Sequence, residues 1–304
     1  MLNPAALLAV VLTTLPSGII DTGRVQVRFE ETDRVAASAL SKLAESTVDD
    51  LCGDLGGCAD DLFEPKLIVV ATPDLAGMRR ALGPGAPAWA AGVAYPARGA
   101  AAVRMDPRGG GWSEVERTFR HEMSHLLLHR AAGGRPLPRW FKEGFAMLQA
   151  REWSFERARS LSAAALSDRL LHLDDLETRF PERRGEITLA YAQASAIVGH
   201  LLRTDSGAFV QMLRSIRRGQ AFREALEEAY GASVGELEAE WQDALNTDYA
   251  LIPLLTGGSA MWVFASMIFL LGYARRRRLD RRTLARWEAE ESAAESGGLA
   301  GLTE

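Results

Sequence analysis

The sequence predicts an α+β fold in which a mixed sheet precedes a mainly helical half, followed by one hydrophobic helix near the C-terminus. Short apolar segments with the character of strands come first, and from residue 113 onward the spacing of apolar residues is helical. A long uncharged run then occupies residues 251–274. Strands that precede helices, rather than alternate with them, favour a sheet from which the helices are segregated.

The composition is that of a folded protein. Of 304 residues, 47% are hydrophobic and 25% are charged, so the chain can bury a core. The net charge of −5 gives no reason to expect nucleic-acid binding. Cys52 and Cys58 do not fit a CxxC redox pair or a four-cysteine zinc site. A small-loop disulfide is expected between them if this region is exported, and two reduced thiols are the alternative.

The first element is the uncharged, mostly apolar segment at residues 1–20. It is similar to the hydrophobic region of a secretory signal peptide, although no Lys or Arg precedes it and no Ala-x-Ala cleavage site follows. We therefore expect a signal peptide here, with an uncleaved hydrophobic anchor or a buried core helix as alternatives.

Residues 21–248 are expected to form one exported domain that begins with the sheet. Val25, Val27 and Phe29 alternate with polar residues, which is typical of a half-buried strand. Later β-branched and apolar runs, bounded by prolines, also predict strands. The expected elements are a strand at 24–31, a helix at 35–51, a central strand at 67–71 and a hairpin formed by 93–95 and 100–105.

The segment WSEVERTFRHEMSHLLLHR, residues 112–130, carries the clearest chemical signal. A capping-box signature starts at Ser113, so a helix is expected to begin there. On that helix His121 and His125 lie one turn apart on one face, with Glu122 beside them. Two imidazoles at this spacing can reach one tetrahedral zinc ion, and the carboxylate can contact the water bound to it.

This HExxH motif needs a third ligand, because so short a pattern also arises by chance. The metzincin extension HExxHxxGxxH fails, since position 128 is leucine and position 131 is alanine. The segment LPRWFKEGFAML instead places Glu143 on the next expected helix, where the small Gly144 permits a close approach to the first helix. The alternatives are a surface helix with a coincidental motif and Glu143 as an ordinary surface residue.

HEMSH followed by WFKEGFA resembles the gluzincin clan of zinc metallopeptidases, and in particular the bacterial peptidase MA-like domains. The match is specific over residues 113–150 and looser over 90–245. The resemblance implies a zincin-like domain in which Glu122 acts as general base and acid. It also implies that the zinc ligands are His121, His125 and Glu143.

The resemblance does not imply a preference for free amino termini, because no equivalent of the G-x-M-E-N strand of the clan's aminopeptidases precedes His121. We therefore favour endopeptidase-like cleavage, in which the strand at 100–105 binds an extended substrate by edge pairing. The resemblance suggests Tyr191, on a helix expected to begin near Leu189, as the group that stabilises the oxyanion. A core tyrosine is the alternative.

The C-terminal end predicts one transmembrane helix. The uncharged run at 251–274 is long enough to cross about 30 Å of hydrocarbon, with a buried hairpin as the alternative. Arg275–Arg278 follow it at once, whereas residues 224–250 contain no Lys or Arg. This asymmetry predicts a cytoplasmic basic tail at 275–304, an extracytoplasmic catalytic domain, and contacts between the arginines and anionic lipids.

The sequence therefore predicts a membrane-anchored zinc metallopeptidase that hydrolyses peptides or proteins with Glu122 as its general base. Two other hypotheses are kept. In the first, the domain is a catalytically silent, zinc-stabilised binding module displayed at the membrane surface. In the second, the chain is an anchor or signalling protein whose HExxH motif is coincidental.

Overall fold

The computed structural model describes residues 18–30, 34–82, 90–105, 111–152, 154–178, 180–181, 184–249 and 258–300. The chain divides into two compact units, Met1–Asp248 and Tyr249–Glu304. In the first unit a mixed sheet is followed by a helical half, which is the order that the sequence predicts. The second unit contains one long helix.

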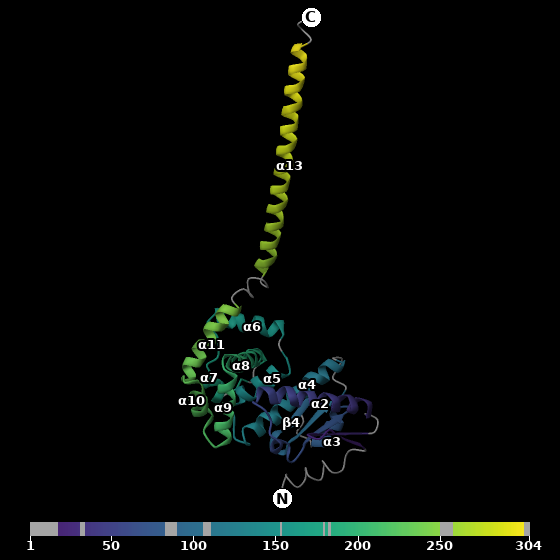
Figure 1. The fold of residues 1–304 in the computed structure, drawn as a ribbon, viewed down its shortest axis with the longest axis vertical. Helices are drawn as coiled ribbons and strands as arrows, with labels where there is room; N and C mark the ends of the chain where they lie inside the picture. Colours follow the sequence, from purple (N-terminus) through teal and green to yellow (C-terminus); the bar gives the residue numbers. More distant parts are fainter. Residues whose placement is uncertain are drawn as a thin grey trace. The chain divides into compact units, whose positions relative to one another are not determined.

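The first unit begins with a five-stranded sheet whose strand order is β1-β2-β3-β5-β4 (Figure 1). The three inner strands are parallel, and each outer strand is antiparallel to its neighbour. The predicted central strand is indeed in the middle of the sheet, and the predicted hairpin is formed by β4 and β5. The strands are β1 (Gly18–Asp21), β2 (Val25–Phe29), β3 (Leu67–Thr72), β4 (Gly92–Tyr95) and β5 (Ala100–Arg104).

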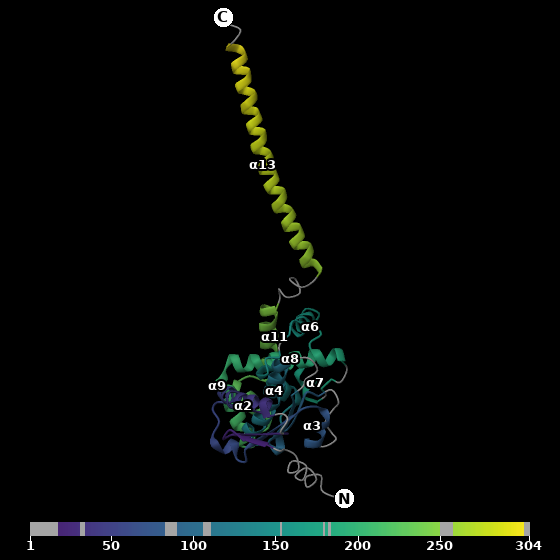
Figure 2. The ribbon, with the colours of Figure 1, turned by 90° about the vertical axis from the view of Figure 1, so that its right-hand side faces the viewer.

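Helices cover both faces of this sheet (Figures 1 and 2). α2 (Arg34–Asp54) and α4 (Gly111–Ala131) pack against each other and against the strands. On the opposite face, Val70 and Ala102, which are paired in register, contact Met78 and Ala81 of α3 (Leu75–Leu82). Because strand side chains alternate between faces, the neighbours of Val70 and Ala102 along each strand point toward α2 and α4.

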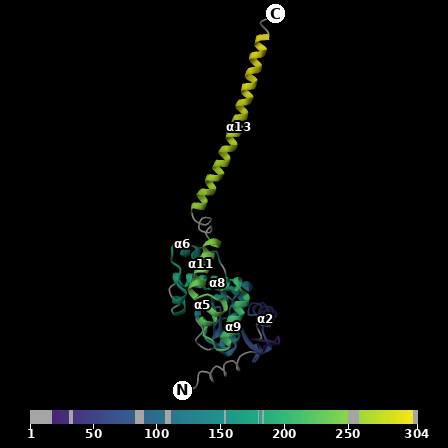
Figure 3. The ribbon, with the colours of Figure 1, turned by 60° about the vertical axis from the view of Figure 1, so that its left-hand side comes forward.

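The helical half is built around α5, which packs against both α4 and α8. Figure 3 shows α5 beside α8. A buried aromatic cluster joins α5 to the later helices α9 and α10: Trp140 and Phe141 of α5 contact Phe222, and Phe141 and Phe145 stack on Phe209. Its helices are α5 (Arg139–Gln149), α6 (Phe155–Leu166), α7 (Leu173–Thr178), α8 (Arg184–Thr204), α9 (Ser206–Arg217), α10 (Phe222–Tyr230) and α11 (Val234–Tyr249).

A glycine sets the distance between α5 and α8. A Cβ atom on Gly144 would lie 2.3 Å from the backbone oxygen of Ala194, so even alanine would force the two helices apart. We expect Gly144→Ala to lower the free energy of unfolding by about 1–3 kcal/mol, measured by chemical denaturation. Gly235→Ala on α11 is the matched control, because nothing lies within 4 Å of its Cβ position and stability should hold or rise. Equal stability of the two variants would contradict this close packing.

Several boundaries differ from the prediction. α4 begins at Gly111, so Ser113 lies inside the helix rather than capping it. Residues 18–20, expected within the N-terminal hydrophobic segment, belong to β1, and residues 1–17 lie outside the described part of the chain. Helix α3 was not among the predicted elements. The disulfide between Cys52 and Cys58 is present.

The predicted transmembrane helix is wrong. No helix among the described residues is long and apolar enough to cross a bilayer. Of the predicted run, the described residues 258–274 belong to α13 (Gly258–Ala300), which continues through Arg275. Residues 251–257 lie outside the described part. The predicted localisation, with an extracytoplasmic domain and a cytoplasmic tail, is wrong for the same reason, and the lipid contacts of Arg275–Arg278 depended on that span.

Candidate metal centre and active site

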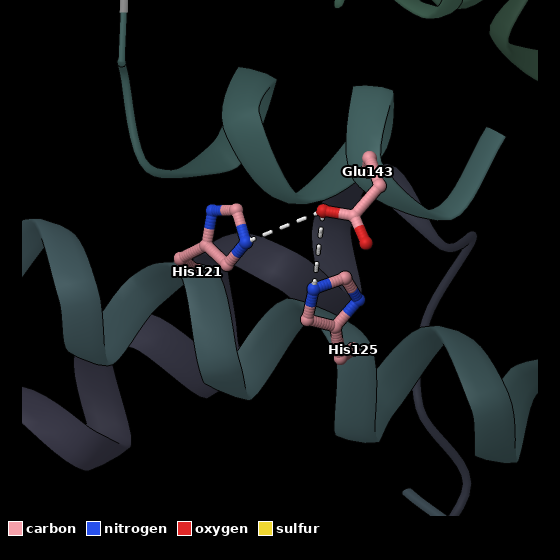
Figure 4. Close-up of side chains that lie close together, drawn as sticks. All are labelled: His121, His125 and Glu143. Atoms are coloured by element: carbon pink, nitrogen blue, oxygen red, sulfur yellow. Dashed lines mark ion pairs between the residues drawn. The ribbon is translucent and has the colours of Figure 1, made fainter. Parts of the chain in front are cut away.

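Two histidines and a glutamate from neighbouring helices converge on one point (Figure 4). His121 and His125 lie one turn apart on α4, and Glu143 faces them from α5. The Oε2 atom of Glu143 is 3.8 Å from Nε2 of His121 and 3.9 Å from Nε2 of His125. One ligand atom from each residue lies within 4.8 Å of the other two. The structure thus brings together the three residues predicted as metal ligands.

This donor set fits a zinc ion. Bonds of about 2.0–2.2 Å to a tetrahedral zinc place ligand atoms roughly 3.4 Å apart, slightly closer than the distances seen here. Burial lowers the pKa of His125 to about 3, with the charges of His121 and Lys142 adding to the effect. The imidazole is therefore neutral, which is the form that binds a metal. Three protein donors are typical of catalytic rather than structural zinc sites.

Glu152, a residue that the sequence analysis missed, holds His121 from behind. Its Oε1 atom lies 3.0 Å from Nδ1 of His121, as an ion pair rather than a well-aligned hydrogen bond. Burial lowers the pKa of His121, but the carboxylates of Glu152, Glu122 and Glu143 together outweigh burial, and the net pKa is raised. Arg157 contacts the other Glu152 oxygen at 3.6 Å. Such a carboxylate fixes the ring and leaves Nε2 free for the metal.

We expect Glu152→Gln to weaken zinc binding by about 10–100-fold, because His121 loses the charge that orients its ring. The measurement is competition with a chromophoric chelator, on the full chain. Glu156→Gln, at an exposed position on α6, removes the same charge nearby and should leave affinity unchanged. Unchanged zinc affinity in Glu152→Gln would show that this carboxylate does not support the site.

Glu122 lies between the metal ligands and the edge of the sheet. Its side chain is buried, and the backbone N–H of Ala94 in β4 donates a hydrogen bond to its carboxylate. Burial raises the pKa of Glu122 to about 7, and the negative charges of Glu143 and Glu152 also raise it against the opposing effect of His121. A carboxylate with a pKa near neutrality is suited to take and return a proton.

Gly92 of β4 makes the space that Glu122 occupies. A Cβ atom at position 92 would lie 2.7 Å from Cγ of Glu122 and 2.6 Å from Cγ2 of Thr118. We expect Gly92→Ala to displace the carboxylate and lower peptide turnover roughly 10²-fold, with zinc stoichiometry unchanged. Turnover and zinc content are measured on the same preparation. Gly53→Ala, with open space around its Cβ position, is the control, and equal turnover of the two variants would argue against this role.

Tyr191, predicted as the oxyanion stabiliser, reaches the same cleft from α8. Its ring packs against Phe180, and its hydroxyl accepts a hydrogen bond from Arg139. Burial raises the pKa of Tyr191, and the charge of Glu143 adds to this, so the phenol stays protonated. Because Arg139 uses an oxygen lone pair, the O–H proton remains available to the cleft.

The cleft around these residues has a volume of about 570 Å³. The outer strand β4 forms one wall through Gly92, Val93 and Ala94. The prediction that the strand at 100–105 binds substrate at an open edge is therefore wrong. Strand β5 is paired on both sides, and β4 is the outer strand on this side of the described sheet. The other histidines lie elsewhere, since His129 lines a separate hollow and His172 is paired with Glu238.

The fold and the site together define a zinc-peptidase-like domain: an HExxH helix against a mixed sheet, with a glutamate from the next helix completing a possible metal site. The profile of the peptidase MA superfamily matches residues 84–247, which is more than half of the chain. The chain belongs to this superfamily, within the gluzincin clan. A comparison with curated proteins found no match.

Proposed function

We propose that this protein is a zinc metallopeptidase that hydrolyses peptide bonds with Glu122 as its general base. The observation that carries the proposal is the position of the buried Glu122 carboxylate, beside the three converging ligands and within an open cleft. A structural zinc site needs no such base. The superfamily match supports a peptidase, and the cleft supports access by a substrate.

A zinc ion held by His121, His125 and Glu143 would supply a Lewis acid and lower the pKa of a water molecule. Glu122 takes a proton from a water molecule while the oxygen of that water adds to the substrate carbonyl carbon. Tyr191 donates its hydroxyl proton in a hydrogen bond to the carbonyl oxygen as negative charge develops there. When the C–N bond breaks, Glu122 returns the proton to the leaving nitrogen, which leaves a carboxyl group and an amine.

We further propose endopeptidase-like cleavage. Among the described residues β4 has no strand on its outer side, so apart from the Ala94 N–H, which is bonded to Glu122, its backbone groups are open to an extended peptide. Strand addition there would carry the scissile bond past Glu122. Such binding uses the main chain of the substrate and places no requirement on a free amino terminus.

The test is digestion of a defined peptide mixture by the zinc-loaded full chain, with new termini identified by mass spectrometry. We expect cleavage within peptides that is abolished by a chelator and restored by added zinc. Zinc-loaded, folded protein that produces no new termini would contradict the proposal and support the silent binding module. Release of single residues from amino termini alone would contradict the endopeptidase assignment.

A further inference from the structure

Two cationic side chains in the cleft form no ion pair with a carboxylate in the described part of the chain, although their charges act on Glu143. Arg139 and Lys142 lie on the first turns of α5, just before Glu143, and both line the cleft. The ion pairs of the described residues include neither of them, although other arginines nearby, such as Arg157, are paired. Both side chains are exposed, so each is accessible to a ligand.

The remaining charges of the cleft are already matched. Glu152 is paired with His121 and with Arg157, and Glu143 faces the two histidines. Glu122 is buried beside them and bonded to the backbone of β4. Two positive charges are therefore left over at the wall formed by α5. The first turn of this helix has no side-chain cap, so its backbone N–H groups add to the positive potential.

Arg139 is held in place before any ligand binds. Its guanidinium lies 4.7 Å from the centre of the Phe180 ring and donates a hydrogen bond to the Tyr191 hydroxyl. Phe180 also packs edge-on against Tyr191, at 5.1 Å between ring centres. A guanidinium held in this way loses little freedom when it binds an anion, and it retains further N–H donors for one.

We propose that Arg139 and Lys142 form a carboxylate subsite of the peptide-binding cleft, so that the protein selects peptides with an acidic side chain or a free C-terminal carboxylate close to the scissile bond. This inference rests on the proposed peptidase function and names its substrate class. A carboxylate can accept two hydrogen bonds from the planar guanidinium of Arg139, and the ammonium of Lys142, on its flexible side chain, can contact the same carboxylate. Arg139 lies one turn before Glu143 on α5, and Lys142 lines the same cleft, which places the carboxylate within a few residues of the cleaved bond.

The test is a binding measurement on the zinc-loaded full chain carrying Glu122→Gln, which keeps the peptides intact. Three rhodamine-labelled peptides of equal length are compared by fluorescence anisotropy. One has an internal Glu and an amidated C-terminus, one has Gln in its place and an amidated C-terminus, and one has Gln and a free C-terminal carboxylate. We expect the first or the third to bind about tenfold more tightly than the neutral second. Whichever binds tightly identifies the source of the carboxylate.

Arg139→Gln/Lys142→Gln in the same background should raise the Kd of the preferred peptide to that of the neutral peptide. Lys42→Gln/Arg159→Gln removes the same net charge at exposed positions outside the cleft and should preserve the tenfold difference. Arg139→Lys, which keeps the charge, should retain part of the preference and guards against loss of folding in the double variant.

The inference is overturned if the three peptides bind alike to the parent protein. It is also overturned if the preference survives the double substitution, because the carboxylate would then lie on the metal. Each result is separable from the proposed function. Wild-type protein that cleaves neutral and acidic peptides equally is a peptidase without this subsite, whereas carboxylate-selective binding without any cleavage leaves the subsite and removes the hydrolysis.

Discussion

Glu122→Gln is expected to bind zinc as the wild type does and to lose about 10³-fold or more of its peptide turnover. Glutamine has the same shape and can still accept the hydrogen bond that Ala94 donates. It cannot take a proton from water or return one to the leaving nitrogen, and loss of a general base typically costs about 10²–10⁴-fold. The measurement is kcat on a cleaved peptide, together with zinc content of the same sample.

The matched control for this prediction is Glu114→Gln. Glu114 lies on the same helix and is paired with Arg117, outside the residues that line the cleft. Its substitution changes the charge of α4 equally and should leave turnover within about twofold of wild type. If Glu122→Gln retains turnover, the carboxylate is not the base, and any hydrolysis must use another group of the cleft.

This variant also separates the two functions that the sequence allows. A silent zinc-binding module needs the ligands His121, His125 and Glu143, but it has no use for a buried carboxylate beside them. Leaving an acid at such a position costs stability, because burial raises its pKa to about 7. If Glu122 has no catalytic role, another interaction must offset this cost, such as its hydrogen bond to the backbone of β4.

The convergence of His121, His125 and Glu143 was predictable because the spacing of the two histidines is local. The i, i+4 spacing of His121 and His125 fixes their relative position on any helix, and the motif around Glu143 supplied the third donor. Glu152 was not predictable, because it approaches His121 only through the turn that ends α5. The stacking of Arg139 on Phe180 likewise depends on the packing of α5 and on a residue far along the chain.

The sheet was predictable in its strands but not in its order. Alternation of apolar and polar residues identifies β2, whereas β3 is recognised as a short apolar run on which most side chains are buried. Tertiary contacts decide which strand of the hairpin pairs with β3. The prediction placed β5 at the open edge, whereas β4 is the outer strand. The transmembrane prediction rested on the number of uncharged residues, and no helix among the described residues has the length and apolarity that a span requires.

Glu143→Ala is expected to reduce zinc affinity by about 10²-fold or more, and to leave less than one zinc per chain after dialysis against a weak chelator. His121 and His125 alone offer two neutral donors, and the carboxylate is the only one of the three ligands that brings a negative charge to the ion. Zinc content of the full chain is measured by atomic emission, with Glu240→Ala at an exposed position of α11 as control.

The stability of the same two proteins tests whether Glu143 serves the metal or the fold. Burial raises the pKa of Glu143, so its charge is costly where it stands unless a cation compensates it. Zinc should therefore raise the Tm of wild type and of Glu240→Ala, because it binds the folded state, and should raise that of Glu143→Ala little or not at all. A wild-type Tm that is indifferent to zinc would mean that these three side chains do not form a metal site, whereas an equal rise in Glu143→Ala would mean that zinc binds without this carboxylate.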